Sequence, residues 1–135
     1  MNIIKCHKGI GETVIGEALV AEDNFSARYD LDRKKGIFSR IEHKLYNKSY
    51  VDKILIFDTA KGGVASAWML HEMKSRNLFP KAILFNRANT ILAQGAALAN
   101  LTMCDRFEID DITKFFFTGQ KLEVNPIEGY VRIIS

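Results

Sequence analysis

The sequence predicts one α/β domain, a barrel-like sheet with two helices laid against it, and three observations support this expectation. Two buried-strand patterns, at residues 53–57 and 81–86, are each followed by a run with helical spacing. The regions near both ends of the chain instead show short strand patterns separated by glycine and polar turns. The length of 135 residues fits a single domain over residues 1–135 with a sizeable core.

The composition is that of an ordinary globular protein, and it argues against two classes of partner. Hydrophobic residues make up 47% of the chain and charged residues 26%. The net charge of +3 comes from interspersed basic residues without a basic stripe, so we expect no nucleic-acid partner. No apolar run is as long as a membrane span, and the first residues lack the apolar core of a signal peptide. We therefore expect no membrane partner and a cytoplasmic location.

The two cysteines predict reduced thiols and no metal site in this chain. Cys6 and Cys104 lie near opposite ends of the sequence, without a CxxC motif or the spacing of a zinc site. Cys6 is followed by His7, but neighbouring residues in a strand point to opposite faces, so we interpret this pair as structural.

The first 52 residues predict a strand pair followed by a long excursion. Residues 3–21 have two short strand patterns, and the spacing of their glycines is not that of a dinucleotide-binding fingerprint. Residues 22–52 are polar but carry at least seven large apolar side chains, which is too many for a free linker. We expect an ordered excursion with one or two short strands, and long ordered loops often bind ligands.

The central segment contains the candidate site. The strand at residues 53–57 is followed by a turn with Gly62 and Gly63, and then by a helix with Ser66 and Met73 on one face. The first turn of a helix leaves backbone N–H groups unpaired, and glycine lets a ligand oxygen approach them. A tight connection without any ligand is an equally good interpretation of the two glycines.

The remainder predicts a second strand and helix and then a return to β structure. Residues 77–80 end the first helix, and Asn89 caps a second helix whose small residues favour close packing on the sheet. The expected β segments after this helix are residues 105–108, 115–117, 121–124 and 130–134.

The residues themselves define no complete active site. The chain has no P-loop and no GxSxG motif. His7, His43 and His71 lack the HxxxH spacing of a metalloprotease, and a lone histidine on a helix is more often structural than a ligand.

Five segments in order carry a resemblance to a known family. They are GEALV at 16–20, FSARYDLDRKKGI at 25–37, HKLYNKSYVDKILIF at 43–57, AKGGVASA at 60–67 and NTILAQGAALANLTM at 89–103. The third is similar to a family pattern HxLxGxSIxGKxLxF and retains His43, Leu45, Ser49 and Lys53. From end to end the chain resembles the small, or swivel, domain of aconitase X, a dehydratase branch of the aconitase superfamily.

The resemblance implies a swivelling β/β/α barrel and a non-autonomous small subunit of a hydro-lyase. Its partner would be a separate large subunit, in a heterodimer, that holds an iron–sulfur cluster through its own cysteines, with no cofactor in this chain. The implied substrate is a small hydroxy acid such as cis-3-hydroxy-L-proline or mevalonate 5-phosphate. A non-catalytic binding or regulatory module on the same fold is the alternative.

The resemblance also assigns site residues, with one departure. The catalytic serine of the family falls at Gly63, and glycine cannot act as a base. Ser66 and Thr59 are the nearby hydroxyls and become the catalytic candidates. The substrate-binding candidates come from the glycine loop and from the excursion: Lys61, Gly62, Gly63, Asp32 and Ser26.

Overall fold

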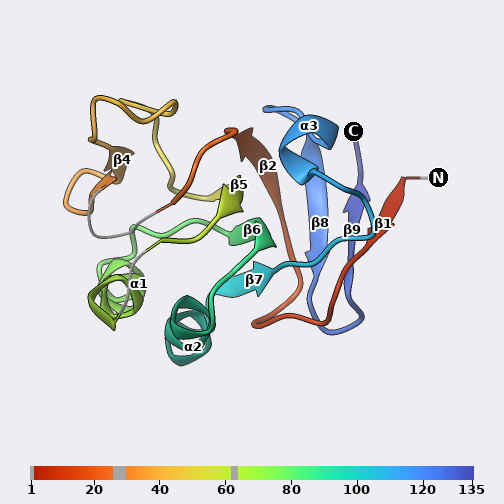
Figure 1. Ribbon diagram of the computed structural model, residues 1–135. Coiled ribbons are helices and arrows are strands. Elements are labelled where there is room, and N and C mark those ends of the chain that lie inside the picture. The colour runs from red at the N-terminus through yellow and green to blue at the C-terminus, as the bar shows by residue number, and fades with distance from the viewer. Residues whose placement is uncertain (1, 26–29, 62–63) are drawn as a thin grey trace.

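A computed structural model describes residues 2–25, 30–61 and 64–135, and its main feature is a seven-stranded mixed sheet (Figure 1). The order across the sheet is β1-β9-β8-β2-β5-β6-β7. The strands are β1 (Ile3–Lys5), β2 (Val14–Val20), β5 (Lys53–Thr59), β6 (Ala82–Arg87), β7 (Thr102–Cys104), β8 (Lys121–Asn125) and β9 (Tyr130–Ile133). Strands β2, β5, β6 and β7 are parallel to one another, and β8, β9 and β1 extend the sheet by antiparallel pairing.

The N-terminal segment joins the two edges of this sheet. After β1 the chain crosses to β7, where the Ile10 N–H donates to the Met103 carbonyl oxygen at 2.9 Å and the Met103 N–H donates back at 3.0 Å. Cys6 forms a second antiparallel bridge with Phe107. Because β1 and β7 are the edge strands, these bridges close the sheet into a barrel. The predicted α/β fold with a barrel-like sheet is confirmed.

Side chains on β5 alternate between two cores. Ile54 and Ile56 lie inside the barrel, where they form one cluster with Leu122, Val124 and Val131. A short helix, α3 (Ile112–Phe115), contributes Ile112 to the same cluster. The barrel interior is therefore filled by aliphatic side chains from both halves of the chain.

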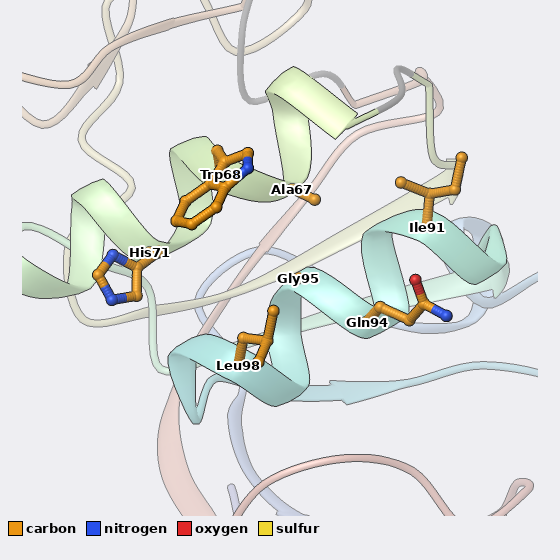
Figure 2. Close-up of a pocket in the computed structure, with 7 residues that line it drawn as sticks. All are labelled: Ala67, Trp68, His71, Ile91, Gln94, Gly95 and Leu98. Atoms are coloured by element: carbon orange, nitrogen blue, oxygen red, sulfur yellow. The ribbon is translucent and has the colours of Figure 1, made fainter.

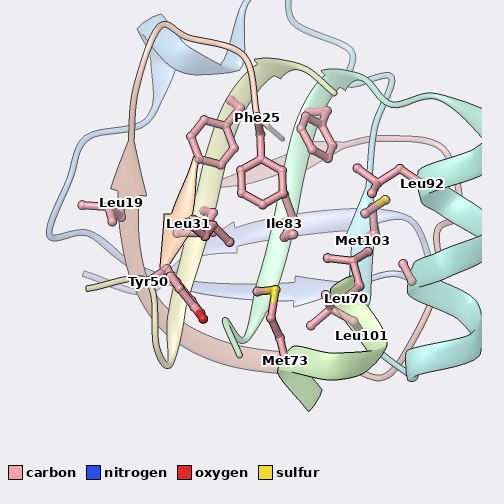
Figure 3. Packing of buried hydrophobic residues seen from close by; sticks show 14 of the residues in the cluster. Leu19, Phe25, Leu31, Tyr50, Leu70, Met73, Ile83, Leu92, Leu101 and Met103 are labelled. Carbon is pink, nitrogen blue, oxygen red and sulfur yellow. The ribbon is translucent and has the colours of Figure 1, made fainter. Parts of the chain in front are cut away.

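The opposite face of the sheet is covered by two helices and by the excursion. Helices α1 (Val64–Ser75) and α2 (Thr90–Ala99) lie side by side on this face (Figure 1). The excursion contains a two-stranded sheet of β3 (Leu31–Asp32) and β4 (Ile37–Phe38). Its Phe25 is buried in the outer cluster (Figure 3). The Phe25 ring stacks on Phe57 of β5 with ring centroids 5.1 Å apart. Tyr50 is also fully buried here, so the described residues of the excursion, 22–25 and 30–52, are ordered as predicted.

The close approach of α1 and α2 depends on one glycine. A Cβ atom at Gly95 would lie 2.7 Å from both the Cα and the Cβ of Ala67, which is too short for real carbon atoms. The predicted N-cap is also present, because the Asn89 side chain accepts from the Leu92 N–H at 2.7 Å. The small residues of α2 thus let the two helices touch backbone to backbone.

Three of the β predictions are wrong. The two strands predicted within residues 3–21 do not pair with each other, because β1 pairs with β9 and β2 lies between β8 and β5. Residues 105–108 form no strand beyond the single bridge at Phe107, since Arg106 has a left-handed backbone with φ of 58° and interrupts regular pairing. Phe115 ends helix α3 and is not part of a strand, because Asp111 caps that helix by accepting from the Thr113 N–H at 3.0 Å. The prediction relied on the apolar run at 115–117 and overlooked the N-cap residue that precedes it.

Candidate functional site

Polar side chains gather at the carboxyl ends of the parallel strands. Thr59 ends β5, Asn86 lies near the end of β6, and Asn24 follows β2. Parallel strands deliver their carboxyl ends to one edge, and ligands of α/β barrels and open α/β sheets alike bind outside that edge. This edge is therefore the candidate site.

The hydroxyl of Thr59 is held by Asn24. The Thr59 Oγ1 donates to Asn24 Oδ1, and the Asn24 backbone carbonyl lies 3.0 Å from His43 Nε2. His43 Nδ1 accepts from the Leu45 N–H at 3.0 Å, so in the neutral ring the proton lies on Nε2 and is donated to Asn24. His43 is buried and stacks on Phe38 with ring centroids 4.9 Å apart. It therefore orients Asn24, and through Asn24 it orients Thr59.

Two aspartates, Asp23 and Asp30, lie beside this network, each with a carboxylate oxygen 3.8 Å from His43 Nε2. Asp30 is buried and accepts from Arg40 Nε at 2.6 Å. Burial alone would raise the pKa of Asp23, but hydrogen bonds from the backbone N–H groups of Asn24 and Lys44, at 2.8 and 3.3 Å, hold that pKa below its ordinary value. Asp23 is therefore ionised at neutral pH.

A second network connects β5, β6 and α3. The amide nitrogen of Asn86 donates to Asp58 Oδ1 at 3.0 Å and to Asp111 Oδ1 at 2.9 Å, and Asn86 Oδ1 accepts from the Ile112 N–H at 2.9 Å. Burial would raise the pKa of Asp111, but hydrogen bonds from Thr113 and Asn86 lower it below its ordinary value. Asp58 and Asp111 line an acidic hollow at this edge. That hollow disfavours a phosphate and favours a cationic or neutral polar group.

The site candidates predicted from the sequence divide into three groups. Thr59, Lys61 and Ser66 lie between the end of β5 and the first turn of α1, three others lie outside the described residues, and Asp32 lies apart. Lys61 lies two residues after Thr59, and the Lys61 backbone N–H donates to the Phe25 carbonyl oxygen at 2.8 Å. Ser66 lies in the first turn of α1. Ser26, Gly62 and Gly63 lie outside the described residues. The edge thus contains Thr59 and Lys61 next to the segment that leads into α1.

Asp32 lies apart from this group. Its carboxylate accepts from the backbone N–H groups of Lys34 and Lys35 at 3.0 and 3.1 Å, so it shapes the β3–β4 turn. The neighbouring Arg33 pairs with Glu72 of α1 at 2.9 Å. A helix rises about 1.5 Å per residue, which places Glu72 roughly 12 Å along the axis from the start of α1. A binding role for Asp32 stays a prediction.

Sequence reasoning missed the groups that organise this edge: Asn24, Asn86, Asp58 and Asp111. A signal was present for two of them, since Asp58 and Asn86 directly follow the apolar cores of the two predicted strands. Asn24 and Asp111 carry no such signal, because only the tertiary structure brings them to the edge.

A separate apolar groove of about 160 Å³ lies between the outer sides of α1 and α2 (Figure 2). Trp68 and Leu98 line it and are 62% and 78% exposed. His71 and Gln94 also line it. The groove is far less polar than the hollow at the carboxyl ends of the strands, so a polar ligand fits that edge better.

Within residues 2–25, 30–61 and 64–135, no three histidine, cysteine, aspartate or glutamate side chains gather as a metal site would require. The expectation that this chain holds no cofactor stays a prediction. No helix in the same residues is long and apolar enough to cross a membrane. The cytoplasmic location stays a prediction.

Comparison with known proteins defines the class of this chain. A family model described as the aconitase X swivel domain matches residues 3–133, and the chain therefore belongs to the aconitase X swivel domain family. The phosphomevalonate dehydratase small subunit of Thermococcus sibiricus is 31% identical over 130 residues, covering 96% of this chain and 97% of that protein. The subunit of the same name from Methanococcoides burtonii is 29% identical over 128 residues, covering 95% and 90%.

A solved structure agrees with this assignment. The crystal structure of Thermococcus kodakaraensis aconitase X in its holo-form superposes with a TM-score of 0.90 at 29% identity, covering 98% of both chains. The swivel-domain fold predicted from the sequence is confirmed.

Proposed function

We propose that this chain is the small subunit of an aconitase X-type dehydratase that acts on mevalonate 5-phosphate together with a separate large subunit. The observation that carries the proposal is its end-to-end similarity to proteins named phosphomevalonate dehydratase small subunit. cis-3-Hydroxy-L-proline is the second substrate considered, since it is also a small hydroxy acid.

The carboxyl edge is the part of this chain that we assign to the reaction. Dehydration removes a proton and a hydroxyl group from adjacent carbons and leaves a double bond. We assign proton removal to a hydroxyl at the end of β5 or the start of α1, with Thr59 and Ser66 as the candidates. Lys61 supplies positive charge for an anionic substrate, whereas the hollow lined by Asp58 and Asp111 does not.

The described residues of the edge do not by themselves make a complete catalytic centre. The hydrogen-bond partner of the Thr59 hydroxyl is an amide oxygen, and an amide does not accept a proton at neutral pH. We expect a large subunit to complete the site and to hold the iron–sulfur cluster, which as a Lewis acid would assist departure of the hydroxyl group.

Co-expression with a large aconitase X-type subunit tests the proposal. We expect a stable complex that dehydrates mevalonate 5-phosphate, while the isolated chain remains folded and inactive. cis-3-Hydroxy-L-proline is assayed in parallel to fix the substrate. A stable, cluster-loaded complex that dehydrates neither compound would contradict the proposal.

Variants of the complex identify the base. Removing the base by Thr59→Val or Ser66→Ala should lower kcat about 100-fold or more. Ser75→Ala is the matched control, because Ser75 lies at the far end of α1 and its hydroxyl donates to the Glu72 carbonyl oxygen. Equal, small effects in all three variants would exclude both candidates.

One observation favours a second function, that of a non-catalytic binding or regulatory module on the same fold. Glycine stands at position 63, where the resemblance places the catalytic serine of the family, and glycine has no side chain that could act as a base. Gly63→Ser discriminates between the two functions. A gain of dehydratase activity from none supports loss of the base, and a fall from existing activity supports a rearranged site.

A further inference from the structure

Cys6 and Cys104, which lie near opposite ends of the sequence, meet at the seam that closes the barrel. The bridge between Cys6 and Phe107 and the pair between Ile10 and Met103 bring the N-terminal segment against the end of β7. The two thiols interact with one another, and Cys6 packs against the barrel-interior cluster that contains Cys104. The fold thus brings together two thiols that are 98 positions apart in the sequence.

The seam makes room for this pair through Gly9. A Cβ atom at Gly9 would lie 2.8 Å from Cys104 Sγ and would collide with the Met103 carbonyl oxygen. Any other residue at position 9 would therefore displace the sulfur of Cys104 or separate the paired backbones. The Cys104 side chain is directed at the N-terminal segment that carries Cys6.

The two thiols are not equivalent. Cys6 is partly exposed, and the hydrogen bond from Cys104 lowers its pKa. Cys104 is buried, and its role as the donor in this hydrogen bond, together with burial, raises its pKa. The adjacent carboxylate of Asp105 acts to raise both values. Cys6 is thus the thiol that ionises first and that a reagent in solution reaches.

We propose that Cys6 and Cys104 form a reversible intramolecular disulfide in which Cys6 is the attacking thiol and Cys104 the resolving thiol. The oxidant is a low-molecular-weight disulfide such as oxidised glutathione. Cys6, after losing its proton, attacks one sulfur of the oxidant, forms a mixed disulfide and releases one equivalent of reduced thiolate. Cys104 then loses its proton and attacks the Cys6 sulfur, expelling the second thiolate. Two protons leave the protein, and the oxidant gains two electrons.

The disulfide would bind the closing segment of the barrel covalently to β7. Cys104 is followed by Asp105, whose Oδ2 accepts from the Ala88 N–H at 3.0 Å at the carboxyl edge of the sheet. The crosslink also closes a long loop of chain, and loops of this size gain most from restriction of the unfolded state. Oxidation would therefore fix the seam covalently.

Intact-mass spectrometry of the folded full chain, incubated with oxidised glutathione, tests the proposal. We expect wild type to lose the mass of two hydrogen atoms and carry no glutathione, and its melting temperature to rise by about 10 °C. Reduction should reverse both changes. A glutathione adduct that persists on wild type, no reaction at all, or a fall in melting temperature would overturn the proposal.

Two variants test the assigned roles. Cys104→Ser should trap the mixed disulfide at Cys6, because the resolving thiol is absent. Cys6→Ser should react at least tenfold more slowly than wild type under native conditions, because its remaining thiol is buried. Trapping in Cys6→Ser in place of Cys104→Ser would reverse the roles and overturn the assignment. The wild-type measurement remains decisive even if either variant folds poorly.

Discussion

The two faces of strand β5 are covered in different ways. Ile54 and Ile56 face the barrel interior, where strands from both ends of the chain enclose them. Phe57 faces the other side, where it contacts the aromatic rings of Phe25 and Phe38 from the excursion. The interior is thus closed by backbone pairing around the barrel, whereas the outer face is covered by helices α1 and α2 and by side chains of the excursion, which has little regular structure. Asn24 and Thr59 of the candidate site are next in sequence, or nearly so, to Phe25 and Phe57 of this aromatic cluster. We therefore expect the candidate site to depend on the packing of these few side chains.

The largest effect should come from removing the aromatic centre of the outer face. Phe57→Ala deletes the stack with Phe25 and a fully buried ring, and we expect it to lower the free energy of unfolding by about 4 kcal/mol. Phe117→Ala is the control, since Phe117 is 66% exposed and should cost about 0.5 kcal/mol. Urea unfolding measures both, and equal losses would show that the excursion does not depend on its aromatic contacts.

A smaller loss of stability should follow from removing the ion pair between Asp30 and Arg40 in the excursion. Asp30→Asn breaks a buried ion pair with Arg40, and because the guanidinium group is 33% exposed we expect a loss of about 2.5 kcal/mol, below the usual range for buried pairs. Glu42→Gln, an exposed change in the same segment, should be nearly neutral. Urea unfolding of both proteins is the measurement, and an Asp30→Asn protein as stable as Glu42→Gln would contradict the prediction.

The contact between the two helices can be tested at Gly95. Gly95→Ala inserts a methyl group 2.7 Å from Ala67, and the two helices must move apart. Overpacking costs about 1–3 kcal/mol and alanine regains about 1 kcal/mol of helix propensity, so we expect a net loss of about 1.5 kcal/mol. Gln94→Ala, on the exposed side of α2, should change thermal stability little. A stabilised Gly95→Ala protein would show that the helices are loosely packed.

The smallest effect concerns α3, which belongs to the barrel-interior core. The pKa of Asp111 is lowered in the folded chain, so its contribution to stability is present above the unfolded pKa of about 3.9 and is lost as the pH falls through the folded pKa. Asp111→Asn keeps the cap without the titration. We expect the wild type to lose about 1 kcal/mol more than this variant between about pH 6 and pH 3, measured by urea unfolding. Identical pH dependence would contradict the lowered pKa.

Local patterns in the sequence determined most of the architecture. Strand β5 and helix α2 were predicted because burial and helical spacing are properties of neighbouring residues, and because Asn89 satisfies its own helix end. The sequence also predicted a candidate site at Thr59 and at the two glycines, Gly62 and Gly63, and that site stays a prediction. The family resemblance then supplied the swivel-domain fold, because its five segments keep their order along the chain.

Only the tertiary structure decided how distant residues meet. The network of Thr59, Asn24 and His43 and the contact between Cys6 and Cys104 join segments far apart in sequence, and no local periodicity encodes such pairs. The strand wrongly predicted at 105–108 has the same cause. That segment has a β-like sequence, but the closing of the barrel and the left-handed backbone of Arg106 determine its structure. Neighbouring residues specify local conformation, whereas the closing of a sheet on itself is specified by contacts across the whole chain.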